Sequence, residues 1–264
     1  MPSVSNIAVG ALVAGAAASK ARHGMNESIA RLSTGMRSMY GGDAGGQSVA
    51  NTLQARSMSW AVSARNAEDG ISAAQTAESA LLEIAALAQR LRELGIQADN
   101  AALLDDDADE AALNAEATAI TEAIDAIILK TTFNGVTVTS SGDLTRAIGV
   151  TDDGGTVSLK ITGVAAVTSG GTIAAGADTT ADAVLEDVAI ALGNVAAGIA
   201  ALKGRQAVAY SASANLAAAA SRVEDTDFAK ETANLTKNSV LNQSAMAMVA
   251  QANQAQSAIL AVLQ

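Results

Sequence analysis

The sequence predicts a mainly α fold, a long coiled-coil helical rod in which the N- and C-terminal helices pair, with a small β-hairpin excursion. Three observations indicate this class. Apolar residues recur at three-four spacing along most of the chain, aromatic residues make up only 2% of its 264 residues, and it contains a single proline. Such helices must pack closely on small residues, because they lack the side chains for a large aromatic core.

Both ends of the chain have a helical pattern and no charge. Residues 1–19 and 238–264 contain no Asp, Glu, Lys, Arg or His, although the formal net charge of the chain is -11. An exposed helix normally carries charge on its outer face, so neither end is built to face water. The C-terminal end also has too few large apolar side chains to fold without a partner. We predict that the two ends pack on each other and on neighbouring chains through a core seam of Ile7, Met25, Leu32, Phe228, Leu235, Met246, Val249, Leu260 and Leu263.

A break and three further helices are expected between the two ends. Four glycines within residues 41–46 make a helix interior costly, so the first helix should end before them. The pattern then predicts a long helix over about residues 47–98. A third helix should start at the acidic turn 104–110, because carboxylates favour a helix N-terminus. A fourth long helix is expected over about residues 181–223.

The segment between the third and fourth helices differs in character. Asn134-Gly135 suits a left-handed turn, and residues 136–180 alternate Thr and Val between turn residues, which predicts short strands. This excursion is too short for an independent domain. The predicted domains are residues 1–42 with 224–264 as an inner terminal-helix domain, and residues 43–223 as an outer helical bundle that includes the 136–180 excursion.

The composition argues against most catalytic and ligand-binding chemistry. The chain has no Cys and one His, His23, so thiolate metal sites, thiol nucleophiles and His-based metal motifs lack their residues. We expect no enzyme activity, no catalytic or metal-binding residue and no cofactor. A sequence pI of about 4.5 with dispersed basic residues argues against nucleic acid as a partner. We also expect no membrane span, because no run of about 18 strongly apolar residues stands out.

Six segments, in order along the chain, resemble signatures of bacterial flagellin. They are NESIARLSTGMR (26–37), ARNAEDGISAAQTAESA (64–80), QRLRELGIQ (89–97), TTFNGV (131–136), SRVEDTDF (221–228) and AQANQAQSAILAVLQ (250–264). The likeness covers roughly residues 24–136 and 184–264. The glycines within residues 40–46 depart from the Ala/Asp-rich turn that is usual in the family.

The resemblance implies a structural subunit that self-assembles into the helical filament of the bacterial flagellum for swimming motility. It implies export through the flagellar type III apparatus and an extracellular location. The implied partners are further copies of the chain, an export chaperone, and the cap and hook-junction proteins. The terminal helices would form the filament core and the middle helices an outer layer. Two alternatives remain open: a flagellar hook-filament junction protein, and a secreted coiled-coil adhesin or effector.

Residues 89–97 are a candidate contact face. On a helix wheel Leu87, Leu91 and Leu94 face the core, which turns the opposite side outward. The resemblance implies that the family buries this face between subunits, and that a host flagellin-sensing Toll-like receptor binds it on the free monomer. Gly95 stands where a larger residue is usual, and a merely solvated helix side is the alternative. The candidate residues are Gln89, Arg90, Arg92, Glu93, Ile96 and Gln97.

The β excursion is expected to be dispensable for assembly. No long apolar seam runs through residues 137–180, and Thr and Ser lie there between turn residues. A short Gly/Ser turn is therefore predicted to replace this segment without loss of filaments.

Overall fold

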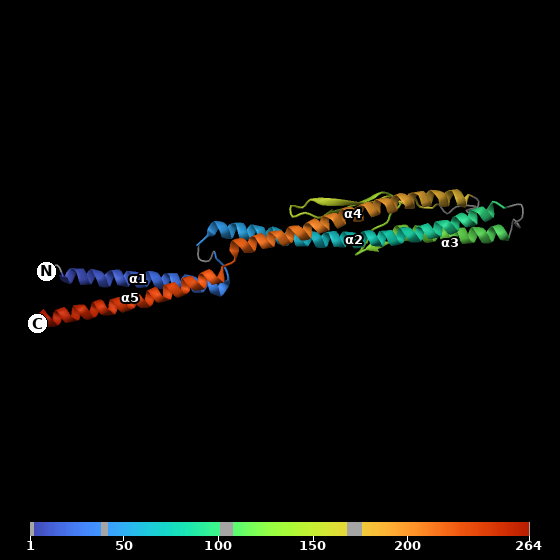
Figure 1. The fold of residues 1–264 in the computed structure, drawn as a ribbon. Helices are drawn as coiled ribbons and strands as arrows, with labels where there is room; N and C mark the ends of the chain where they lie inside the picture. The colour runs from blue at the N-terminus through green and yellow to red at the C-terminus, as the bar shows by residue number, and fades with distance from the viewer. Residues whose placement is uncertain (1–2, 38–41, 101–107, 168–175, 264) are drawn as a thin grey trace. The chain divides into compact units, whose positions relative to one another are not determined.

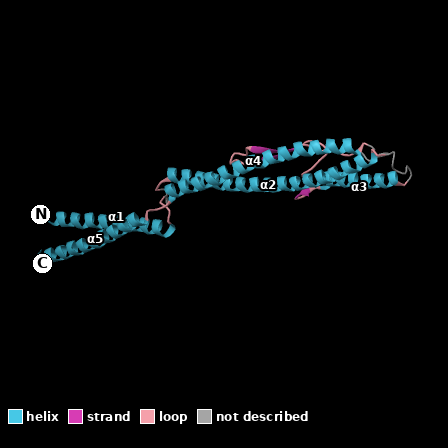
Figure 2. Ribbon diagram, turned by 45° about the vertical axis from the view of Figure 1, so that its right-hand side comes forward, coloured by secondary structure: helices cyan, strands magenta, loops and turns pink. Residues whose placement is uncertain are grey.

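The computed structural model describes residues 3–37, 42–100, 108–167 and 176–263. Within these ranges the chain is mainly helical, with short strands between the third and fourth helices (Figures 1 and 2). The helices are α1 (Ser3–Thr34), α2 (Ala44–Ala98), α3 (Asp109–Lys130), α4 (Ala177–Glu224) and α5 (Phe228–Leu263). The predicted class, mainly α with a small β excursion, is confirmed.

The helix ends follow local capping chemistry. α1 stops at Gly35, whose φ of 72° lets the chain turn while its N–H donates to the carbonyl oxygen of Arg31 at 2.8 Å. The carboxylate of Asp43 accepts from the N–H of Gly46 at 2.8 Å and caps α2, and Asp227 caps α5 in the same way. α2 therefore begins at residue 44 rather than at about residue 47, because the cap at Asp43 offsets the cost of the glycines that follow it.

The chain folds as two compact units. Unit 1 comprises residues 1–55 and 216–264, and unit 2 comprises residues 56–215. In unit 1, α1 and α5 pack side by side and antiparallel, with both termini at the same end of the pair (Figures 1 and 2). The linkers at their other end are joined by backbone hydrogen bonds. The N–H of Arg37 donates to the carbonyl of Glu224, and the N–H of Thr226 donates to the carbonyl of Gly35, both at 2.8 Å.

Unit 2 is built around an apolar core between α2, α3 and α4. The three-four spacing of apolar residues on these helices brings one side of each into the core. The largest fully buried side chains on the helices are Leu81, Ile84, Leu91, Leu94, Ile124, Ile128, Val188, Val195 and Leu202.

Two antiparallel hairpins follow α3. β1 (Thr132–Phe133) and β2 (Val136–Thr137) enclose Asn134 and Gly135, whose φ values of 48° and 75° fit the two-residue turn that Asn-Gly favours. β3 (Leu144–Gly149) and β4 (Thr156–Ile161) form the longer hairpin, with Leu144 opposite Ile161. The predicted strands are therefore present, and they form two separate pairs.

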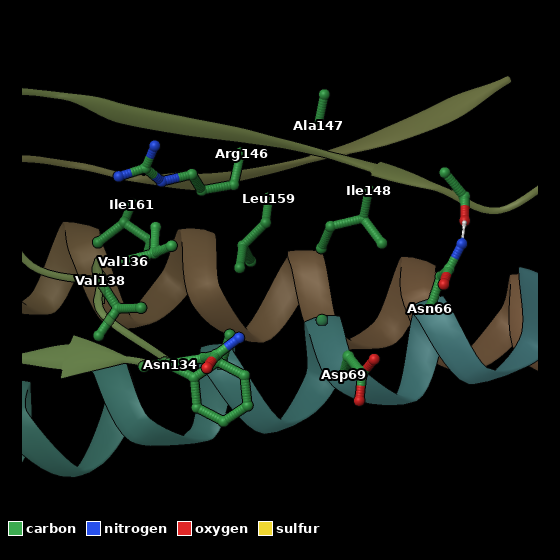
Figure 3. Close-up of a pocket in the computed structure, with 14 residues that line it drawn as sticks. Asn66, Asp69, Asn134, Val136, Val138, Arg146, Ala147, Ile148, Leu159 and Ile161 are labelled. Carbon is green, nitrogen blue, oxygen red and sulfur yellow. Dashed lines mark hydrogen bonds between the residues drawn. The ribbon is translucent and has the colours of Figure 1, made fainter. Parts of the chain in front are cut away.

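The longer hairpin fits into glycine hollows on two helices. A Cβ atom on Gly70 of α2 would overlap the Cδ1 of Ile148, and one on Gly198 of α4 would lie 2.5 Å from the Cδ1 of Leu159. Figure 3 shows Ile148, Leu159 and Ile161 pointing from the strands toward the helices, where they line a hollow of about 480 Å³. The absence of a side chain at Gly70 and Gly198 thus allows the hairpin to lie close to both helices.

The β excursion therefore contributes buried apolar side chains to the core of unit 2. Its dispensability for filament assembly stays a prediction. Asn66 of α2 donates from Nδ2 to the carbonyl of Gly149 at 3.2 Å, which adds a polar attachment (Figure 3). The three-four spacing that marks a helix is absent from strands, whose inward side chains alternate, so the apolar contribution of this segment was not visible as a seam. Its buried apolar residues are Val138, Val150, Leu159, Ile161, Val164 and Val167.

We expect Gly198→Ala to destabilise unit 2 by about 1–3 kcal/mol, because the added Cβ displaces the buried side chain of Leu159. Gly193→Ala on the same helix is the matched control, since a Cβ there meets nothing within 4 Å. Helix propensity alone makes that control neutral or slightly stabilising. Urea unfolding followed by circular dichroism measures both variants. Equal unfolding midpoints for the two would contradict the fit of the hairpin into the hollow.

One described helix, α4, is long and apolar enough to cross a membrane by length and composition alone, with a mean hydropathy of 1.6 over an 18-residue window. This departs from the expectation that no such run stands out. Val184, Val188 and Val195 of α4 are buried in the core of unit 2, whereas 28% of the apolar window as a whole is buried.

Candidate assembly and receptor-contact surfaces

The candidate contact face lies near the C-terminal end of α2. Leu91 and Leu94 are fully buried in the core of unit 2. The opposite side of the helix is exposed, and it carries Gln89, Arg90, Arg92, Glu93, Ile96 and Gln97. Ile96 is the large apolar residue among them, with 53% of its surface exposed. The face is therefore accessible on the single chain, and its role in binding stays a prediction.

Arg90 joins this face to α3. Its Nε and Nη2 donate to Oε1 of Glu116 at 2.8 and 2.7 Å, and its Nη1 donates to Oε2 of Glu93 at 2.9 Å. The hydrogen bond to Glu116, followed by the one to Glu93, raises the pKa of Arg90 above its already high ordinary value, so this side chain keeps its charge. All three side chains are well exposed, so the ion pairs contribute little to stability. Their effect is to hold the guanidinium in one place on the surface.

Two acidic residues from other helices complete the face. Glu116 of α3 pairs with Arg90, and Asp182 of α4 accepts from the Nε of Arg92 at 2.7 Å. No sequence signal places these carboxylates here, because they lie 26 and 90 residues from the arginines they contact. A hollow of about 650 Å³ between the end of α2 and the start of α3 is lined by Ile96, Gln97, Asn100, Asp109, Ala112, Leu113 and Glu116.

The inward residues of α1 and α5 form a second surface, which we call the terminal-helix seam. Buried or half-buried residues recur on both helices at three-four spacing, as in a coiled coil. On α1 they are Ala11, Ala14, Ala18, Ala21, Met25, Ser28 and Leu32, and on α5 they are Glu231, Leu235, Asn238, Asn242, Ala245, Val249, Ala252 and Gln256. A small, mostly alanine side of α1 thus meets a partly polar side of α5.

The predicted core-seam residues fall into three groups. Met25, Leu32, Leu235 and Val249 are half-buried in the terminal-helix seam. Phe228 and Met246 are 56% and 50% exposed on the single chain, and their place in the filament-core seam stays a prediction. Several inward positions of α5 carry small or polar residues instead. The side chains of Ile7, Leu260 and Leu263 lie outside the described residues.

Most large apolar side chains of unit 1 face outward. They lie within or next to the uncharged segments 1–19 and 238–264. Their exposed fractions run from 48% to 77%, for Val9, Leu12, Val13, Val240, Leu241, Met246 and Met248. An exposed apolar surface that also lacks charge is typical of a site covered by another protein.

One charged pair, of half-buried Arg31 with buried Glu231, lies in the terminal-helix seam. The side chain of Glu231 is only 8% exposed, and its Oε1 lies 3.5 Å from Nη1 of Arg31. This oxygen has no hydrogen-bond partner among the described residues, and neither has the buried Oδ1 of Asn242. Sequence reasoning missed Glu231 because a glutamate in a helix is normally assigned to the solvated side.

Comparisons with known proteins cover almost the whole chain. Residues 6–141 match the family model of the bacterial flagellin N-terminal helical region, and residues 203–263 match that of the C-terminal helical region. A flagellin of Halalkalibacterium halodurans is 33% identical over 249 residues, which are 90% of this chain and 91% of that protein. A flagellin of Bacillus subtilis is 32% identical over 279 residues, covering 90% of this chain and 92% of that protein.

Proposed function

The chain belongs to the bacterial flagellin family, and from that premise we propose that its terminal helices carry the contacts that build the filament. It is a structural subunit of the bacterial flagellar filament, and it is located outside the cell after export. It assembles with further copies of itself. No finding favours a hook-filament junction protein or a secreted adhesin or effector.

The outward apolar surface of unit 1 carries the proposal for the terminal helices. Leu12 is 77% exposed and Met248 is 60% exposed, and neither has a charged residue near it in sequence. A helical filament needs contacts between different faces of successive subunits that do not close into a ring. Uncharged helices with apolar residues on their outer sides supply such contacts on several faces. We assign residues 1–42 with 224–264 to the filament core and residues 43–223 to the outer layer.

The outward apolar surface of unit 1 also suggests how the subunit meets the partners that bind it before export and at the two ends of the filament. An export chaperone would cover the apolar outer side of α5 until the subunit is exported, and the cap and hook-junction proteins would offer it a complementary surface. We further propose that the chain has no catalytic role. Its sequence has no Cys and a single His, and no group of three or more His, Cys, Asp or Glu within the described ranges is placed to hold a metal ion.

Electron microscopy of the purified protein after salting-out tests the assembly proposal. We expect filaments, together with an increase in helix content by circular dichroism, because α1 and α5 gain neighbours beyond each other in the polymer. A chain that stays monomeric under conditions that polymerise the Bacillus subtilis relative would contradict it.

We also propose that the α2 face binds a host flagellin-sensing Toll-like receptor when the subunit is free. The support is the fixed guanidinium of Arg90 beside the exposed Ile96, since a held charge next to an apolar side chain is typical of binding hot spots. In the filament this face is expected to lie between subunits, so the monomer and not the polymer would bind.

The double variant Arg90→Ala with Glu93→Ala is expected to weaken receptor binding by the monomer about tenfold or more, which is about 1.4 kcal/mol. Helicity should not change, because the ion pairs lost are exposed. Lys160→Ala with Asp143→Ala is the matched control, since it removes another exposed pair of unit 2. Biolayer interferometry that gives equal affinities for the wild type and both variants would reject this face.

A further inference from the structure

One position in the terminal-helix seam is shaped to receive a polar side chain. A Cβ atom built on Gly24 of α1 would lie 2.6 Å from Nδ2 and 3.1 Å from Cγ of Asn238 on α5. Both residues are half-buried. The amide of Asn238 therefore occupies the space that any side chain at position 24 would take, and we call this space the Gly24 notch.

The pair of Arg31 and Glu231 lies one heptad from this contact. Arg31 follows Gly24 by seven residues on α1, and Glu231 precedes Asn238 by seven residues on α5, as expected for antiparallel helices. One further heptad toward the termini, Ala17 and Ala245 line one hollow between the two helices. Along the seam toward the termini, the charged pair is therefore followed by the amide of Asn238 in the Gly24 notch, and then by small apolar residues.

The alanine part of the seam does not define how the helices align. The inward positions 11, 14, 18 and 21 of α1 all offer α5 the methyl side chain of alanine. A shift of one heptad, about 10 Å along the helix, would therefore replace one alanine by another at each contact. A single polar residue at an inward position of a coiled coil fixes alignment, at some cost in stability. After such a shift, Asn238 would face a residue with a side chain instead of the notch.

We propose that the contact of Gly24 with Asn238 is a register lock that fixes the alignment of α1 against α5, with the pair of Arg31 and Glu231 as its second point. The lock is a property of one chain, and it rests on the proposed function only in that the filament uses the aligned pair. The polar atoms left without partners at Glu231 and Asn242 fit a seam selected for alignment rather than for strength.

Engineered cysteine pairs read the alignment directly, because the chain has no cysteine of its own. Ala17→Cys with Ala245→Cys reports the aligned state, and Ala17→Cys with Ala252→Cys reports a shift of one heptad. Each pair is oxidised in purified filaments, and mass spectrometry of mixed isotope-labelled and unlabelled subunits separates cross-links within one chain from those between chains. In the parent chain we expect the 17–245 cross-link to exceed the 17–252 cross-link about tenfold.

Gly24→Ala and Asn238→Ala should each raise the 17–252 yield at least about threefold, since each removes the notch contact. Gly15→Ala is the matched control on the same helix, because a Cβ there meets nothing within 4 Å. Both glycine-to-alanine variants gain helix propensity, so their helix content cannot distinguish them. The cross-link yields, which report the alignment of the helices, can. If a variant forms no filaments, the same oxidation is made on its monomer beside the Gly15→Ala monomer.

A 17–252 yield in Gly24→Ala and Asn238→Ala that equals the yield in Gly15→Ala would overturn the lock. Failure of the filament proposal is seen separately, since the parent chain without cysteines would then give no filaments by electron microscopy.

Discussion

Removal of residues 238–264 is expected to abolish filament formation and to leave a soluble, partly helical monomer. The deletion takes Asn238, Asn242, Ala245 and Val249 out of the terminal-helix seam, so the inward side of α1 loses most of its partner. It also removes the outward apolar residues Val240, Leu241 and Met248. Unit 2 keeps its own core of α2, α3, α4 and the hairpins, which accounts for the remaining helix content.

Electron microscopy after salting-out and circular dichroism of the soluble fraction measure the two parts of this result. The Gly193→Ala chain, with an unaltered unit 1, serves as the assembling control. Normal filaments from the truncated chain would show that α5 beyond residue 237 is not an assembly element.

Arg31→Met is expected to have the largest effect of any single substitution considered for unit 1. It leaves the carboxylate of Glu231, with only 8% of its side chain exposed, buried without a counter-charge, which costs about 3–5 kcal/mol. If unit 1 folds as the subunit assembles, this raises the subunit concentration left in solution beside filaments by about a hundredfold or more. Arg31→Met combined with Glu231→Met should recover most of the loss, because no charge then stays buried.

Arg37→Met is the matched control for this prediction. Arg37 pairs with Asp43 at 2.8 Å, a shorter contact than the 3.5 Å between Arg31 and Glu231, but both side chains are well exposed. Burial rather than distance decides the effect, so this variant should change stability by less than about 1 kcal/mol. A larger loss for Arg37→Met than for Arg31→Met would contradict the argument.

The two terminal helices show what a sequence pattern can and cannot predict. On α1 the predicted positions Met25 and Leu32 lie in the seam, because the inward residues also set the three-four spacing of that helix. On α5 the largest apolar residues do not mark the inward side. Met246 is 50% exposed, while its neighbour Ala245 is buried. When a helix is apolar on its outer side as well, hydrophobic periodicity no longer identifies the side that pairs within the chain.

Unit 2 shows a second limit. The long helices and the Asn134-Gly135 turn follow from local patterns, and the structure contains them. The fit of Ile148 against Gly70 and of Leu159 against Gly198 depends on residues far apart in sequence, as does the contact of Arg90 with Glu116. A glycine inside a helix was visible only as a weak helix former, and its use as a hollow for a distant side chain needs the fold.

The hydrogen bonds between the two linkers of unit 1 have a consequence for how the subunit tolerates change in length. Because Gly35 and Arg37 are held against Thr226 and Glu224, all residues between them form a loop whose ends are already closed. The entropy of closing a flexible loop grows only with the logarithm of its length, and each doubling costs about 0.6 kcal/mol. An insertion at the turn between β3 and β4 would therefore lengthen this loop at little cost to the pairing of α1 with α5. Unit 2 can therefore change in size while α1 and α5 keep the same fit.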